Sequence, residues 1–494
     1  MKKKLLYLIV LLLPMLGMSQ SEPAVYKDFG NNIRQYTCSF PFDEHLAISQ
    51  INTDNENFDL VAINDHMETR WKVSLSGYAM KAARVADKII AVAVTDYTFF
   101  KGKGSCYKGY IIDPADGKVL TEKILYEGSA EYMEFPALLT GSGASFKLGI
   151  RQSAVKRKVH TPLPGPLALF SLNSYGKQYQ ETKSLTVLDF NDRLEIVGSL
   201  KPVIYNGPLI GMEAGAQGDV FVAWLKEGHI TVDHYNLGKQ AAPVQLTSGL
   251  ELSENNGFLF DSDILFFPSA TSKSMLYYSL MYVNAEKDHE LVVGKMDFTS
   301  GKAILVKEAF SKDHVKSLEK AFIPVNTKMN KADIGGPRGL DVRYLAEANG
   351  KVVVTVSAKE LQVGARTSWI EERSILINGY DTDLGLRFQQ FLPAQYIYIG
   401  GSIPTGYHTS GNKFYSIAND KRGMATLNGL YGVLDLNSGK WDKMEWLSKR
   451  KIGGFDYADA PDAFWFVDSF VLPYCGKKGI MGDKRDITLQ QNSY

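Results

Sequence analysis

One hairpin pattern recurs along the chain and constrains its fold more than any other feature. An alternating apolar run ends at Asp, Gly follows four residues later, and Lys opens the next run. The clearest copies are YKGYIIDPADGKVLTEKI, LVVGKMDFTSGKAILVKE and LYGVLDLNSGKWDKMEW, with Gly117, Gly301 and Gly439 in the Gly position. A short loop built on a type I turn needs one residue with positive φ, which Gly adopts without penalty, and Asp caps such turns. The pattern is typical of antiparallel sheets.

Weaker copies extend the repeat over most of the chain. Gly385 follows Asp381 and Gly238 follows His234 at the same spacing, while Glu68 and Arg193 occupy the Gly position in two degenerate copies. The segments between these positions fit four strands per unit; QYIYIGGSI, KFYSIAND, GLYGVLDL and KWDKMEWL make one predicted set. Repeated four-stranded antiparallel units predict a β-propeller, because each sheet must bury both faces against its neighbours.

We therefore predict an all-β protein, a β-propeller of seven or eight four-stranded blades, with eight preferred. Seven units cover residues 34–447, and residues 448–494 form an eighth blade or complete the seventh. Pairing of the first strand with the last would close the ring and remove exposed sheet edges. The spacing of the units is irregular, so an array of β-sandwich domains is the alternative.

The first nineteen residues are expected to be a signal peptide. MKKK is a basic start, residues 5–16 are apolar, and Gly17, Met18 and Ser19 give a small-residue cleavage context. The apolar run is too short for a spanning helix, and no later run is long enough. We expect residues 20–494 to form a single exported, soluble propeller domain, periplasmic or at the cell surface.

Charge and cysteine content restrict the classes of partner. The chain has 55 basic and 54 acidic side chains, so it lacks the excess of positive charge that is typical of nucleic-acid-binding proteins.

Three cysteines in an oxidising compartment leave at least one unpaired. Cys38 and Cys475 lie near opposite ends of the mature chain, and a disulfide between them would join the termini; three buried thiols are the alternative.

The segment LVAINDHMETRWKVSLSG resembles the repeat of quinoprotein-type propellers, in which an apolar strand, Asp and a turn precede a Trp that opens the outer strand. Trp71 and Trp441 occupy that Trp position. The resemblance implies an exported propeller of seven or eight blades, such as the quinone-dependent dehydrogenases or the propeller lipoprotein of outer-membrane assembly. This chain lacks adjacent cysteines, a Trp in most repeats and a cysteine at the signal cleavage site, so neither function is carried over.

No catalytic signature stands out in the sequence. There is no G-x-S-x-G elbow, and the eight His are spread singly without metal-ligand spacing. We therefore predict no catalytic residues, no cofactor and no metal site. The alternative is a propeller hydrolase or lyase for glycans or lactones with carboxylates at the central channel, for which Asp459, Asp462 and Asp468 form a candidate cluster beside aromatic residues.

Two insertions exceed the length of a repeat unit. Residues 151–168 carry Lys156, Arg157 and Lys158 ahead of three prolines, and residues 311–341 carry a short helix signal and a Gly-Pro loop around Arg338. The predicted helix has Ser311 as its cap and Val315, Leu318 and Phe322 on one face. Long loops on a rigid scaffold concentrate binding residues. We therefore predict a binding or protein-interaction platform with an envelope or surface protein as partner, and Lys156, Arg157, Lys158 and Arg338 as candidate contacts.

Overall fold

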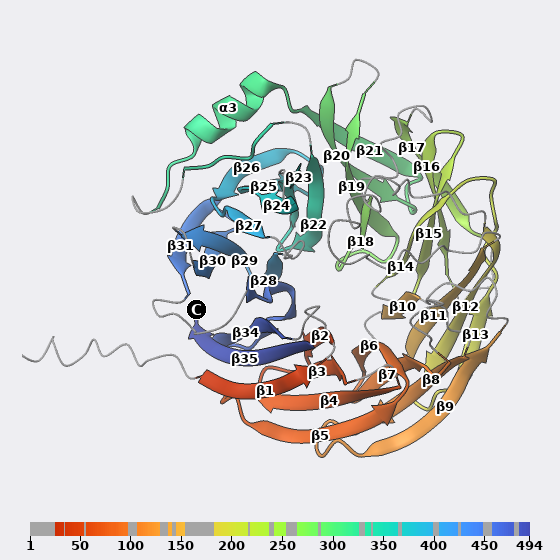
Figure 1. Ribbon diagram of the computed structural model, residues 1–494. Helices are drawn as coiled ribbons and strands as arrows, with labels where there is room; N and C mark the ends of the chain where they lie inside the picture. Colours follow the sequence, from red (N-terminus) through yellow and green to blue (C-terminus); the bar gives the residue numbers. More distant parts are fainter. Residues whose placement is uncertain are drawn as a thin grey trace, which may run out of the picture.

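The computed structural model shows a ring of eight sheets around a central axis (Figure 1). It describes residues 25–33, 35–53, 56–96, 106–128, 137–140, 145–153, 182–215, 218–236, 242–252, 264–284, 288–325, 331–336, 339–363, 368–398, 405–422, 426–447, 457–478 and 484–494. The prediction of an eight-bladed propeller is confirmed. The predicted signal peptide lies outside the described residues.

The first four blades follow the chain, each from its innermost to its outermost strand. They are β2 (Gln35–Pro41), β3 (Leu46–Asn52), β4 (Asn57–Asn64) and β5 (Thr69–Ser76); β6 (Tyr78–Val85), β7 (Lys88–Val94), β8 (Cys106–Ile112) and β9 (Val119–Glu127); β10 (Ala137–Thr140), β11 (Ser145–Ser153), β12 (Thr182–Asn191) and β13 (Ile196–Leu200); and β14 (Leu209–Ala214), β15 (Val220–Lys226), β16 (His229–Tyr235) and β17 (Val244–Glu251).

Blades 5 to 7 continue this order, and blade 6 carries two additional strands. The blades are β18 (Leu265–Pro268), β19 (Met275–Val283), β20 (His289–Asp297) and β21 (Lys302–Ala309); β22 (Leu340–Ala348), β23 (Lys351–Val363), β25 (Ile375–Asp381) and β26 (Leu386–Leu392); and β28 (Gly406–Ser410), β29 (Lys413–Arg422), β30 (Thr426–Asp435) and β31 (Lys440–Trp446). The additional strands are β24 (Ser368–Glu372) and β27 (Tyr396–Tyr398).

Blade 8 closes the ring with strands from both ends of the chain. From the inside it contains β32 (Tyr457–Ala458) and β33 (Phe464–Trp465), then β34 (Ser469–Lys478), β35 (Lys484–Ser493) and, outermost, β1 (Val25–Ile33). A 3-10 turn, η3 (Ala460–Asp462), separates β32 from β33. The predicted closure between the first and last strands is confirmed, and the segment after residue 447 contributes the eighth blade.

The hydrophobic core lies between adjacent blades. Middle strands are buried along almost their whole length, as in β19, because a neighbouring blade covers each of their faces. Outer strands such as β21 alternate between half-buried and exposed residues. One core cluster joins Tyr107 of blade 2 to Phe146 of blade 3, and another joins Phe221 of blade 4 to Leu276 of blade 5. A single blade could not bury these faces alone.

The repeated hairpins form two kinds of turn, whereas the sequence predicts one. Gly117, Gly301 and Gly439 have positive φ, as expected. In the other kind, the residue with positive φ comes three residues after the Asn or Asp that opens the turn instead of four; these residues are Met67, Leu194 and Leu384. The predicted positions Glu68, Arg193 and Gly385 are therefore wrong as positive-φ positions. Gly238 lies outside the described residues.

Leucine and methionine tolerate the left-handed conformation in these turns because their side chains are packed. Met67, Leu194 and Leu384 are all buried, and each belongs to a different interblade core cluster. Each turn closes with the same two backbone hydrogen bonds, for example from Asn191 N to Glu195 O and from Leu194 N to Asn191 O. Burial of the side chain offsets the backbone strain.

One predicted strand set is wrong in its first member. The inner strand of blade 7 is β28, and the segment around Tyr396 instead forms β27, which pairs with β24 of blade 6.

The predicted helix is confirmed as α3 (Lys312–Ala321): the Ser311 side chain accepts a hydrogen bond from His314 N, and Val315 is buried. In the described part of the chain, no helix is long and apolar enough to span a membrane.

The predicted disulfide between Cys38 and Cys475 stays a prediction. Cys475 is buried on β34, and its Sγ lies 3.6 Å from Asp459 Oδ2. Cys38 lies on β2, the inner strand of blade 1, and its side chain is outside the described part. The β1–β35 ladder closes the ring through backbone hydrogen bonds.

Candidate functional site

The two faces of the ring differ in their connections. Antiparallel order places the first-to-second and third-to-fourth strand connections of blades 1 to 7 on one face, here named the turn face. The other connections emerge on the opposite face, here named the loop face. Turns such as residues 113–118 and 435–440 occupy the turn face, whereas both predicted insertions start and end on the loop face.

Hydrogen bonds between neighbouring blades hold the turn face together. Trp71 Nε1 donates to Pro114 O across blades 1 and 2 at 2.7 Å, and Gln390 Nε2 donates to Gly439 O across blades 6 and 7 at 2.9 Å. Between blades 5 and 6, the buried Glu347 carboxylate accepts hydrogen bonds from Ser269 Oγ and Thr271 Oγ1. These contacts satisfy polar groups within the scaffold, so we assign this face a structural role.

Aromatic side chains also press on the turns of the next blade. A Cβ on Gly117 would lie 2.6 Å from the Trp71 ring, and one on Gly439 would lie 2.5 Å from Phe388. Trp71 and Phe388 both occupy the third position of an outermost strand. These two turns need glycine for two reasons: glycine adopts positive φ without penalty, and any Cβ there would collide with the aromatic side chain of the neighbouring blade.

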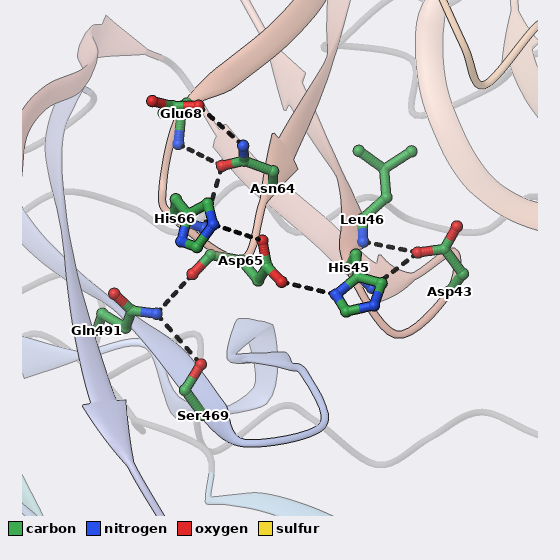
Figure 2. A network of polar contacts seen from close by, with 9 residues as sticks. All are labelled: Asp43, His45, Leu46, Asn64, Asp65, His66, Glu68, Ser469 and Gln491. Atoms are coloured by element: carbon green, nitrogen blue, oxygen red, sulfur yellow. Dashed lines mark hydrogen bonds and ion pairs between the residues drawn. The ribbon is translucent and has the colours of Figure 1, made fainter.

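A polar network joins blades 8 and 1 at the closure of the ring (Figure 2). Gln491 Nε2 donates to Asp65 O and to Ser469 Oγ, which fixes the turn before β5 against blade 8. His45 Nδ1 lies 2.7 Å from Asp65 Oδ2, and the hydrogen bond and charge of Asp65 raise the pKa of the exposed His45 imidazole. The network therefore ties blade 8 to blade 1 at the seam.

The loop face carries an elaboration of blade 6 that the ring does not require. Strand β23 extends beyond its blade, and its residues 359–363 pair with β24, which pairs in turn with β27. Helix α3 lies at the perimeter beside the same blade (Figure 1). It packs through Val315 into the core shared by blades 5 and 6. Two strands, the extension of β23 and a helix are thus added at one sector of this face.

A cluster of charged side chains ties the elaboration together. Arg373 Nη1 pairs with Asp333 Oδ2 at 2.8 Å, and Arg373 Nη2 lies 3.3 Å from Glu371 Oε1. Gln395 Nε2 also donates to Asp333 Oδ2. The Asp333 side chain remains 44% exposed, so the cluster keeps polar groups available to a partner.

A second set of charges lies deeper, where β22 meets the elaboration. A bulge between Val342 and Tyr344 leaves Arg343 as an extra residue, and its Nη1 pairs with Asp341 Oδ2 at 3.0 Å. Lys359 is the direct cross-strand partner of the buried Glu372. Burial lowers the pKa of the Lys359 ammonium, and Glu372 opposes this shift. Bulges that redirect a side chain are frequent beside functional sites.

The predicted contact residues fall outside the part of the chain that can be described. Lys156, Arg157 and Lys158 belong to the connection between β11 and β12, and Arg338 precedes β22. Residues 331–336, from the same insertion as Arg338, do enter the charged cluster through Asp333. The sequence signal that flagged this sector was the length of the insertion, whereas Lys359, Glu371 and Arg373 carried no signal of their own.

Two of the three carboxylates named in the alternative prediction share the η3 turn, in which Asp462 N donates to Asp459 O at 3.2 Å. Asp459 is buried at the start of η3, and Asp468 is exposed and accepts a backbone hydrogen bond from Tyr494. Glu213, on the inner strand β14, is different: burial raises the pKa of its carboxyl to about 7, and Lys81 of β6 opposes that shift. Among the described residues, no three His, Cys, Asp or Glu side chains gather as a metal site requires.

The comparisons with known proteins show no family for this chain. No protein-family model matches the chain, and no curated protein matches it. The WD40 domain of SCAP from fission yeast is 10% identical, with a TM-score of 0.39 over 95% of this chain and 98% of that chain. BamB from Moraxella catarrhalis is 10% identical, with a TM-score of 0.28 over 90% and 82%.

A third structure has the same general likeness. The β-propeller domain of the Trilobed protease from Pyrococcus furiosus is 9% identical, with a TM-score of 0.39 over 85% of this chain and 98% of that chain. Likenesses at these TM-scores carry no argument about function. The assignment of this chain as a β-propeller repeat protein rests on its strand topology.

Proposed function

We propose that this protein is an exported, non-catalytic β-propeller that binds a protein partner in the bacterial cell envelope through the loop face at blade 6. One observation carries the proposal: this sector holds an additional sheet and a half-exposed charged cluster that the ring does not need. The contacts described on the turn face join blades to one another, whereas the loop face carries the long connections in which binding residues concentrate.

Export and relationship to the quinoprotein-type propellers belong to the same proposal. Residues 1–19 supply the signal, and the hairpin repeat with Trp71 supplies the likeness. Mass analysis of the protein from fractionated cells tests export. We expect a chain beginning at Gln20 in the periplasmic or extracellular fraction; an uncleaved chain in the cytoplasm would remove the envelope from the proposal.

Photocrosslinking in living cells tests the proposed docking face. A photoreactive residue at Lys331, beside the charged cluster, should give a discrete adduct with one envelope protein. The matched control places the same residue at Lys302, an exposed position on the turn face, where we expect no adduct. Adducts from Lys302 alone, or from neither position, would overturn the proposal.

Glu213 favours a second candidate function, a hydrolase or lyase acting in the central channel. A carboxyl with a pKa near 7 is suited to general acid catalysis. A panel of polysaccharides and lactones, assayed with the wild-type protein and with Glu213→Gln, tests this function. Turnover that is lost in the variant would support the enzyme, and absence of turnover on the whole panel would leave the binding platform in place.

A further inference from the structure

Helix α3 separates its charged side chains by direction. Lys312, Lys316 and Lys320 recur every four residues, so they lie along one stripe, and all three are exposed. The polar groups that face the propeller are engaged there: Glu319 Oε1 accepts from Ile334 N at 2.9 Å, and His314 Nε2 lies 2.8 Å from Glu308 Oε1. Within the described chain, the three lysines form no ion pair.

The stripe is only partly favourable for the helix: Asp313 lies three residues before Lys316, a spacing at which opposite charges attract, but the lysines also repel one another. Lys312 occupies the first helical position, where the helix dipole is positive and disfavours a cation. Like charges at spacing i, i+4 repel each other, and this stripe contains two such pairs. Only Lys320, in the last turn, lies where a cation is favourable. The arrangement therefore needs a reason outside the helix.

Exposed apolar side chains follow directly after the stripe. Ile323 is 83% exposed and Val325 is 51% exposed, while Phe322 turns inward onto Phe391 at 5.7 Å between ring centroids. The other exposed large hydrophobic side chains of the described chain are 40% to 58% exposed. Ile323 thus protrudes further than any of them, beside a row of cations.

We propose that α3 and residues 323–325 dock the propeller on an anionic lipid surface. Three ammonium groups along a line of roughly 12 Å match a plane of headgroups, and Ile323 and Val325 can enter the interface beside them. All three cations are Lys, which act as point charges, and none is Arg, whose planar fork suits individual carboxylates of a protein partner. The inference goes beyond the proposed protein partner and does not depend on it.

Vesicle sedimentation with the purified mature chain tests this inference without any partner protein. We expect binding to vesicles that contain phosphatidylglycerol, no binding to pure phosphatidylcholine, and release by added salt. The triple variant Lys312→Glu, Lys316→Glu, Lys320→Glu should lose more than about 100-fold in affinity, since each lysine contributes roughly five-fold and each glutamate adds repulsion. Ile323→Ser should lose several-fold while keeping the sensitivity to salt.

A matched triple variant separates a local site from the effect of net charge. Lys118→Glu, Lys302→Glu, Lys440→Glu changes the charge by the same amount at exposed positions on the turn face, and it should bind as the wild type does. Equal losses in both triple variants would overturn the site at α3. Failure of the wild type to bind the anionic vesicles at low salt would overturn the whole inference and leave a protein as the partner of this surface.

Discussion

At the scale of single residues, two glycines with the same backbone conformation have different surroundings. Gly117 has φ 75° and Gly301 has φ 70°, and both follow an Asp that caps the turn. A Cβ on Gly117 would lie 2.6 Å from the Trp71 ring, whereas a Cβ on Gly301 would meet nothing within 4 Å. The same substitution at both glycines would therefore add similar backbone strain, but only at Gly117 would it also disturb the packing between blades.

We expect Gly301→Ala to cost about 1 kcal/mol, the penalty of the left-handed conformation for a residue with Cβ. Gly117→Ala should cost about 3 kcal/mol, because it also displaces Trp71 and its hydrogen bond to Pro114. Chemical unfolding of both variants gives the comparison. Equal losses would show that the contact of Trp71 with the turn contributes nothing to stability.

His408 makes stability depend on pH. Its ring stacks on Trp465 at 4.8 Å, and burial lowers its pKa to about 4. Between pH 6.5 and 4 the unfolded chain binds a proton that the folded chain does not, so stability is lost as pH falls through this window. The loss is at most about 3 kcal/mol. His408→Phe keeps the stacking and should flatten this part of the curve of unfolding free energy against pH; an unchanged slope would contradict the prediction.

At the scale of elements, the sequence predicted hairpins with Gly at the turn and missed those with a buried apolar residue there. Met67, Leu194 and Leu384 precede Glu68, Glu195 and Gly385, so the missed signal is Asn or Asp, two residues, an apolar residue, then Glu or Gly. Local propensity argues against an apolar residue at positive φ. An apolar residue at this position becomes favourable only because the neighbouring blade buries its side chain. A single sequence does not show which segment of the chain packs against the turn.

Leu194→Gly tests this balance between strain and packing. Glycine relieves the left-handed conformation by about 1 kcal/mol, but removing a fully buried leucine side chain costs about 3 kcal/mol or more. We therefore expect a net loss of stability in chemical unfolding, although glycine is the residue that the turn alone would favour. A stabilised variant would show that the turn, and not the core, determines this position.

The elaboration of blade 6 was only partly predictable. The periodicity of residues 311–322 identified α3, because an N-cap and an apolar face are local signals. The added strands β24 and β27 come from separate segments and pair only through tertiary contacts, so the segment around Tyr396 was predicted as an inner strand of blade 7. Lys359 and Arg373 are ordinary charged residues in the sequence, and folding alone brings them to one sector.

At the scale of the whole molecule, the ring is closed by its least regular outer ladder. In blade 8, Val25 pairs with Gln490 and Ile33 with Arg485, so nine residues of β1 oppose six of β35 and the register shifts twice. By contrast, the outer ladder of blade 5, between β20 and β21, pairs over eight residues without a shift. The polar network of Gln491 and Asp65 is a second tie across the seam, which partly compensates for the weak ladder.

Opening of the ring should therefore begin at blade 8. Amides of β1 lack the unbroken ladder that protects a regular strand, so we expect hydrogen exchange in residues 25–33 to be fast relative to residues 275–283 and 289–297. Exchange followed by mass spectrometry of peptides measures both regions in one experiment. Gln491→Leu removes the donor to Asp65 and should accelerate exchange in β1 while leaving β19 unchanged. Equal protection of the two regions would show that the seam is as stable as the other blades, and that closure does not depend on the polar network.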